Sequence, residues 1–108
     1  MILTYSGKKI NLNARKLGKF SKGIGLMFKS SMSENLLFEF KRDVNIAIHS
    51  FFVFFPFLAI WLDSKNKVID FKLVNPFTFT VKPTKKFRRL IEVPINWKNR
   101  ELVKLFIK

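Results

Sequence analysis

The feature that most constrains the fold is a long uncharged segment in the middle of the chain. Residues 44–62 contain no Lys, Arg, Asp or Glu, although these types make up 26% of the sequence. The segment approaches the roughly 20 apolar residues that a membrane-spanning helix needs. Three polar residues lie in its first third, however, and Pro56 would interrupt a helix near its middle. Because Phe, Ile and Val favour strands, we expect two buried strands, over residues 46–55 and 58–62, rather than a membrane span.

Turn signals and alternating residues extend this pattern into a β-rich fold. Residues 63–66 read Asp-Ser-Lys-Asn, which is a strong turn signal. Beyond the turn, Ile69, Phe71 and Leu73 alternate with polar residues, so this strand should pair back on residues 58–62. Strands so closely spaced are typical of a barrel or sandwich. Further strands are predicted over residues 2–5, 10–12, 36–41, 78–82 and 90–93, and the tail over residues 102–107 could form a strand or a helical turn.

One short helix is expected near the N-terminus. Apolar residues recur at spacings of three and four from Ala14 to Met27, which is the period of an amphipathic helix. Three glycines within that stretch disfavour a long helix, which places a short one near residues 15–28. The sequence therefore predicts a mainly β fold (β-rich α+β), organised as a compact, barrel-like single domain over residues 1–108.

Composition restricts the chemistry available to the chain. The absence of Cys excludes disulfides, cysteine-ligated zinc, iron–sulfur clusters and cysteine nucleophiles. A single His excludes a site that needs two imidazoles from one chain, and seven carboxylates leave little for a metal cage. We therefore expect no cofactor, no metal and no catalytic residues, and we favour binding over catalysis without excluding an enzyme.

The positive charge is concentrated at the two ends of the chain. The sequence has a net charge of +14, and its first 33 residues contain no acid. If the two basic ends met on one face, that face would attract nucleic acid, an anionic lipid surface or an acidic partner. Alternatively, the lysines reflect a compositional bias and are solvated surface. The candidate polyanion contacts are Lys16, Lys19, Lys22, Lys85, Lys86, Arg88 and Arg89.

The chain contains 14 Phe residues, and several of them are clustered in residues 51–57. Alternate residues of a strand point to opposite faces, so Phe on both faces indicates a strand that is covered on both sides. A stacking platform for bases would instead place cations beside the rings. Residues 51–62 contain no cation, which favours core packing.

His49 is the one ordinary general base near neutral pH. A lone His on an apolar strand is more often a hydrogen-bonded structural residue than a catalytic one, and its neighbour Ser50 would face away from it. We nevertheless expect any ligand pocket near His49, Trp61, Met27 and Phe51, beside the turn over residues 23–28. Glu92 lies between apolar neighbours, which predicts a buried carboxylate that needs a basic partner.

Five short segments, taken in order, resemble a known family. They are residues 21–29 (SKGIGLMFK), 49–56 (HSFFVFFP), 60–68 (IWLD and the following KV), 75–77 (NPF) and 90–94 (LIEVP). Their order and spacing over about residues 14–96 are similar to those of domain-of-unknown-function family 192, archaeal members included. The resemblance implies a compact, mostly β, barrel-like domain with a short helix. It implies no activity, because the family is uncharacterised.

Two positions depart from the family pattern. Leu58 stands where the family usually has an Asp, and Ile95 and Asn96 stand where it usually has a Gly. If that Asp serves a site in relatives, this chain has lost that part of it, whereas the fold should be unaffected.

Two functions of different class follow. The favoured one is a non-catalytic domain that binds a small ligand or a protein. The alternative is a module that binds a polyanion, either nucleic acid or an anionic membrane surface, through its Lys/Arg-rich ends. No signal segment is recognisable at the start of the chain, so we expect a cytoplasmic location and no transmembrane helix.

Overall fold

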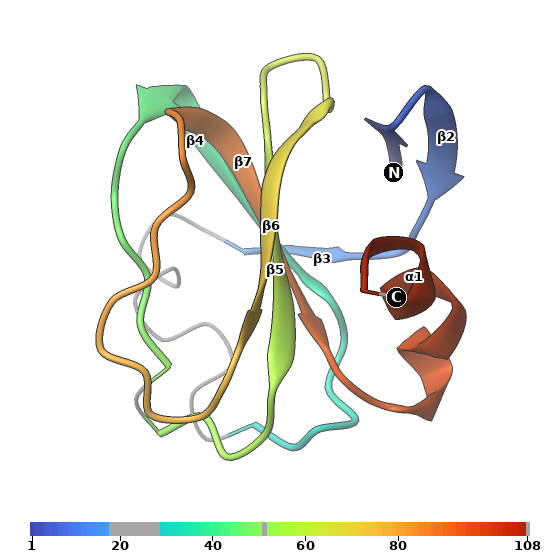
Figure 1. The fold of residues 1–108 in the computed structure, drawn as a ribbon, viewed down its shortest axis with the longest axis vertical. Coiled ribbons are helices and arrows are strands. Elements are labelled where there is room, and N and C mark those ends of the chain that lie inside the picture. Colours follow the sequence, from blue (N-terminus) through green and yellow to red (C-terminus); the bar gives the residue numbers. More distant parts are fainter. Residues whose placement is uncertain (18–28, 51, 108) are drawn as a thin grey trace.

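The computed structural model describes residues 1–17, 29–50 and 52–107, and its core is a five-stranded sheet. The strand order is β3-β4-β7-β5-β6, and a separate hairpin pairs β1 with β2 (Figure 1). All pairings are antiparallel except the parallel pairing of β3 with β4. The elements are β1 (Ile2–Tyr5), β2 (Lys8–Asn11), β3 (Arg15–Leu17), β4 (Leu36–Val44), β5 (Phe57–Leu62), β6 (Val68–Val74), β7 (Phe87–Pro94), the 3-10 helix η2 (Trp97–Asn99) and α1 (Arg100–Phe106).

Strand β5 is the centre of the core, and all six of its residues are buried. Its alternate side chains enter two separate apolar clusters, one on each face of the sheet. Phe57 and Trp61 belong to the cluster that includes Val53, Phe55 and Val81 of the long loops. Leu58 and Ile60 belong to the cluster beneath the β1–β2 hairpin and α1, which includes Leu3, Leu12 and Phe106. The sheet is therefore covered on both faces.

The predicted turn and its flanking strands are confirmed. The Asp63 carboxylate accepts hydrogen bonds from the backbone N–H groups of Lys65 (2.8 Å) and Lys67 (2.9 Å), which closes the turn between β5 and β6. The β-rich fold with one short helix is likewise confirmed, and Glu92 is buried as expected. Within the residues described, the sheets do not close into a barrel, because β3 and β6 are the edges of the larger sheet.

The helix predicted from residue 15 is not found in the part of that range which the structure describes. Arg15–Leu17 forms β3, which pairs in parallel with the start of β4, and the N–H of Arg15 donates to the carbonyl of Asn35 at 2.8 Å. Pairing with a strand distant in sequence overrides the local helical spacing. Residues 18–28 lie outside the described residues. The helix that the structure does show is α1, where a strand or a helical turn was expected.

The long strand predicted over residues 46–55 is wrong in its described part. Those residues form a loop, with one isolated bridge between Ile48 and Val81. The strand predicted over residues 78–82 is also wrong, because only Val81 pairs and Phe79 is 74% exposed. The alternation survives locally, since Val53 and Phe55 are buried while Phe52 and Phe54 are exposed. None of the helices described is long and apolar enough to cross a membrane.

Candidate functional site

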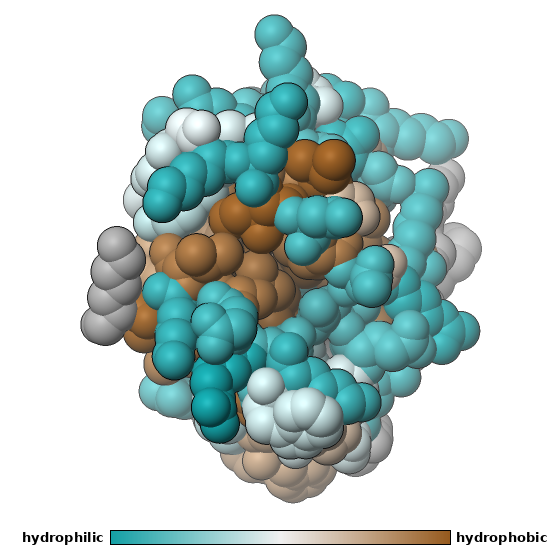
Figure 2. All heavy atoms as spheres, turned by 90° about the vertical axis from the view of Figure 1, so that its right-hand side faces the viewer, coloured by the Kyte–Doolittle hydropathy of each residue, from teal (hydrophilic) through white to brown (hydrophobic). Residues whose placement is uncertain are grey.

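The β1–β2 hairpin and α1 enclose a cleft of about 270 Å³. Figure 2 shows this side of the molecule, where hydrophobic residues gather in the middle and hydrophilic residues surround them. The cleft is lined by Tyr5, Ser6, Lys8, Lys9, Ile10, Lys104 and Leu105. The N-terminal and C-terminal basic ends therefore meet at one place in the fold, and none of the lining residues is acidic.

The hairpin turn places Lys8 and Lys9 at this cleft. Ser6 and Gly7 both have positive φ, at 50° and 76°, and the paired residues Tyr5 and Lys8 flank them. This is the geometry of a two-residue type I′ turn, which matches the twist of the paired strands. Gly adopts the left-handed conformation without strain, so the sequence itself specifies the tight turn.

Aromatic packing fixes the hairpin against the helix. The ring of Tyr5 stacks on Phe106 of α1 at 4.6 Å between centroids, and both rings contact Phe71 of β6 edge-on. The hairpin is also joined to the β5–β6 turn, because the N–H of Thr4 donates to the carbonyl of Asn66 at 2.9 Å. The walls of the cleft are thus held by packed rings and backbone hydrogen bonds.

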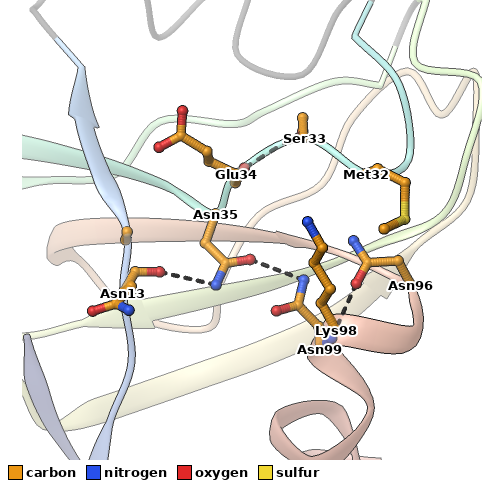
Figure 3. Close-up of a pocket in the computed structure, with 9 residues that line it drawn as sticks. Asn13, Met32, Ser33, Glu34, Asn35, Asn96, Lys98 and Asn99 are labelled. Carbon is orange, nitrogen blue, oxygen red and sulfur yellow. Dashed lines mark hydrogen bonds between the residues drawn. The ribbon is translucent and has the colours of Figure 1, made fainter.

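A second, more polar pocket of about 310 Å³ lies between the start of β4 and the helix η2 (Figure 3). Its amide side chains are largely bonded to one another and to the backbone. Asn99 donates to the side-chain oxygen of Asn35 (3.0 Å) and to the carbonyl of Pro94 (2.8 Å), while Asn35 donates to the carbonyl of Asn13 (3.0 Å). These bonds tie η2 to β4 and to the segment before β3, so we assign the amide cluster a structural role.

The region predicted around His49 is a pair of loops joined at Ser50. The Ser50 hydroxyl donates to the carbonyl of Asn75 at 2.6 Å and accepts from the N–H of Thr78 at 2.5 Å. The Ser50 backbone exchanges three more bonds, with Thr78, Phe77 and Val53, at 2.9–3.1 Å. Ser50 is fully buried and His49 is exposed. The Ser50 hydroxyl therefore holds two loops together.

Of the other predicted ligand contacts, the structure describes Trp61. Trp61 is 0% exposed, and its indole N–H has no hydrogen-bond partner among the residues described. It packs in the core with its ring 6.4 Å from that of Phe87, so a ligand on the surface does not reach it. Met27 and Phe51 lie outside the described residues.

Three of the predicted polyanion contacts are held by carboxylates. Lys16 and Arg89 both contact Glu39, at 2.8 and 2.7 Å, and Arg88 contacts Asp43 at 3.1 Å. Hydrogen bonds first from Arg89 and then from Lys16 lower the pKa of the Glu39 carboxyl, against the opposing effect of desolvation. Lys85 and Lys86 are exposed, and Lys19 and Lys22 lie outside the described residues.

Arg89 also forms hydrogen bonds to the turn between β5 and β6. Its guanidinium donates to the carbonyl of Ser64 and to the side-chain oxygen of Asn66, each at 3.1 Å, in addition to Glu39. A planar group with several donors suits this task better than a lysine. We read Arg89 as a structural residue of the sheet.

Sequence reasoning anticipated that the basic ends could meet but missed the residues at which they do. Lys8, Lys9 and Lys104 carry no motif, and no periodicity in the sequence shows that the hairpin packs on α1. In the part of the chain that the structure describes, no group of three or more His, Asp or Glu residues could hold a metal ion. The cleft offers three lysines and apolar surface.

A family model matches residues 4–105, and it is that of DUF192, described as "Uncharacterized ACR". The chain is 34% identical over 73 residues to a "UPF0127 protein" of Thermococcus gammatolerans, a match that covers 66% of this chain and 47% of that protein. It is 33% identical over 73 residues to a "UPF0127 protein" of Thermococcus kodakarensis, with 66% and 46% covered. The match thus spans about half the length of these relatives.

Two crystal structures share the fold. One, from Sinorhizobium meliloti, is provisionally described as a transcription regulator, and it has a TM-score of 0.76 at 15% identity, covering 94% of this chain and 82% of that one. The other is a protein of unknown function from Novosphingobium aromaticivorans, with a TM-score of 0.75 at 13% identity, covering 99% and 77%. At these identities the likeness concerns the fold alone.

Proposed function

The chain belongs to the DUF192 family, and from this premise we propose that it is a non-catalytic binding domain whose ligand occupies the cleft between the β1–β2 hairpin and α1. The observation that carries the proposal is the convergence of Lys8, Lys9 and Lys104 on a cleft that has no acidic residue in its lining. The proposal joins ligand binding with the basic ends of the chain at one site.

The chemistry of the lining defines the class of ligand. Ile10, Leu105 and the ring of Tyr5 offer apolar surface, and the three lysines offer point charges around it. A complementary ligand has a small apolar body and one anionic group. Pockets for drug-sized molecules usually enclose about 300–1,000 Å³, whereas this cleft encloses about 270 Å³. A medium-chain carboxylate therefore fits the class, and octanoate is a suitable probe.

Titration of the isotopically labelled protein with octanoate tests the proposal by nuclear magnetic resonance. We expect the amide shifts to concentrate in residues 5–10 and 104–105. The neutral 1-octanol should bind about tenfold more weakly, because it keeps the apolar body and loses the charge. Higher salt should weaken octanoate binding for the same reason. Equal affinity for octanol, or shifts that fall elsewhere, would show that the cleft is not the site.

Matched lysine variants locate the charge. Replacement of Lys8, Lys9 and Lys104 together by Gln should lower octanoate affinity more than tenfold, and Lys104→Gln alone by roughly twofold to fivefold, as for exposed ion contacts worth under about 1 kcal/mol. Lys65→Gln is the control, because Lys65 is exposed in the β5–β6 turn and does not line the cleft. An equal loss in the control would mean that net charge alone attracts the probe.

Binding of RNA tests the polyanion alternative. A module for nucleic acid should bind a random single-stranded RNA at low salt, with an affinity that falls steeply as salt increases. If RNA binds tightly and octanoate does not, the alternative replaces the proposal.

A further inference from the structure

Away from the cleft, two loops display an exposed aromatic surface. The loops join β4 to β5 and β6 to β7, and in Figure 1 they run along the left and bottom of the molecule, while α1 and β2 lie on the right. Their exposed rings, called here the aromatic face, are those of Phe52 (47% exposed), Phe54 (61%), Phe77 (47%) and Phe79 (74%).

Three rings of the aromatic face contact one another. Phe77 contacts Phe54 edge-on at 5.3 Å and Phe52 at 6.5 Å between ring centroids. Single exposed apolar residues are common, but contiguous exposed apolar patches mark interaction surfaces. Because the rings come from two loops, their proximity depends on the contacts between those loops.

Ser50 supplies those contacts. Its buried hydroxyl and backbone bond to Asn75, Phe77 and Thr78 of the opposite loop. The loop that bears Phe52 and Phe54 is thereby fixed against the loop that bears Phe77. Hydrogen bonds between the two loops therefore hold the exposed rings in place.

Backbone conformation supports the same conclusion. Phe52 and Phe77 both have left-handed φ, at 57° and 59°. Bulky residues rarely adopt this conformation, since the side chain crowds the following carbonyl. Such strain persists only where the surroundings enforce it, and it is concentrated at functional positions. Here it occurs at two rings that share one exposed surface.

Charge indicates what covers the aromatic face. Residues 44–62 and 73–81, which carry the two loops, contain no charged residue, and Lys72 and Lys82 border the second segment. The ammonium of Lys72 donates to the backbone carbonyl of Lys82, so the two lysines are neighbours at this border. A second copy of the chain would bring two charges of +14 together, which opposes association.

We propose that the aromatic face docks on the surface of an anionic lipid bilayer. The Phe rings enter the boundary between headgroups and acyl chains, while the basic shell is attracted to the anionic headgroups. Attachment of this kind is peripheral. It differs from the ligand cleft in both position and chemistry.

Sedimentation with lipid vesicles tests this proposal. The full chain should pellet with vesicles of phosphatidylcholine containing a quarter phosphatidylglycerol, and at least tenfold less with phosphatidylcholine alone. The double variant F54S/F79S should partition to the anionic vesicles at least tenfold less than the wild type. Trp97→Ser is the matched control, because Trp97 is a 70% exposed aromatic outside the two loops, and it should leave partitioning unchanged.

Three outcomes would overturn the proposal. They are pelleting of the double variant at the wild-type level, equal pelleting with both types of vesicle, and a wild-type dimer in analytical ultracentrifugation that F54S/F79S dissociates. The last would assign the aromatic face to a second copy. Circular dichroism of the double variant should match that of the wild type. If it does not, the single variant Phe79→Ser, at a ring that is 74% exposed, should still pellet less than the wild type.

Discussion

At the scale of single residues, Ser50 shows how one hydroxyl can determine the course of two loops. It is fully buried, and its oxygen donates to the carbonyl of Asn75 and accepts from the N–H of Thr78. Buried polar atoms are tolerated only when they are paired. The segment around Ser50 can thus leave the sheet while keeping Val53 and Phe55 in the core.

Ser50→Ala should lower the free energy of unfolding by about 1–3 kcal/mol, because the N–H of Thr78 loses its partner and the carbonyl of Asn75 keeps only the hydroxyl of Thr78, at 2.8 Å. Urea denaturation followed by circular dichroism measures the loss. Ser64→Ala in the exposed β5–β6 turn is the control, and it should change stability by about 0.5 kcal/mol or less. Equal stabilities of the two variants would contradict the role assigned to Ser50.

The ion pairs of Glu39 make the stability of the fold depend on pH. The lowered pKa of Glu39 means that its ion pairs stabilise the fold fully well above the ordinary value of 4.5, and that this contribution is lost as pH falls through the folded-state pKa. Glu39→Gln should therefore show a shallower loss of stability between pH 6 and pH 3 than the wild type. Thermal melts across that range measure it, and Glu101→Gln on exposed helix surface should retain the wild-type slope.

At the scale of elements, the sequence predicted the strands that are continuous and the turns that have a chemical signature. Strands β5, β6 and β7 follow from apolar runs, alternation and Pro94, and the turn between β5 and β6 follows from Asp63. The strand predicted over residues 46–55 is a loop in its described part. Its composition favours strands, whereas its position depends on the hydrogen bonds of Ser50, which no periodicity encodes. The cleft was missed for a related reason, since hairpin and helix meet only in three dimensions.

The turn of the β1–β2 hairpin depends on the residue at position 7. Gly7→Ala should destabilise the fold by about 1 kcal/mol, because φ is +76° there, even though open space surrounds the missing side chain. Ser6→Asn should act in the opposite direction by a few tenths of a kcal/mol, since Asn-Gly is the preferred pair for this turn. Urea denaturation of both variants checks the signs, and a stabilising Gly7→Ala would contradict the assigned turn type.

The buried side chains of strand β5 should contribute strongly to stability. Leu58→Ala should cost roughly 2–5 kcal/mol, because Leu58 is 0% exposed in the cluster beneath the hairpin. Leu73→Ala on neighbouring β6 is the control, and at 48% exposure it should cost about 0.5 kcal/mol. Leu58, which stands where the family usually has an Asp, thus packs in the core. Similar costs for the two variants would refute this.

At the scale of the whole molecule, the net charge of +14 is distributed over a chain of 108 residues, and its mutual repulsion opposes compaction. Added NaCl screens that repulsion over about 10 Å at 0.1 M. The melting temperature should therefore rise as NaCl increases from the millimolar range to that concentration. The variant K65E/K85E carries less positive charge, so its melting temperature should rise less. A melting temperature that falls with salt would mean that attraction within ion pairs such as Glu39–Arg89 outweighs the repulsion.

The contrast between the two tryptophans gives the molecule two built-in spectroscopic reporters. Trp61 is 0% exposed and Trp97 is 70% exposed, so their fluorescence should differ in emission wavelength and in access to dissolved quenchers. The ammonium of Lys98 lies 6.0 Å from the ring centre of Trp97 and would draw the anion iodide toward that indole. Iodide should therefore quench the fluorescence of Trp97 and leave that of Trp61. The two signals distinguish binding at the surface from opening of the core without any attached dye.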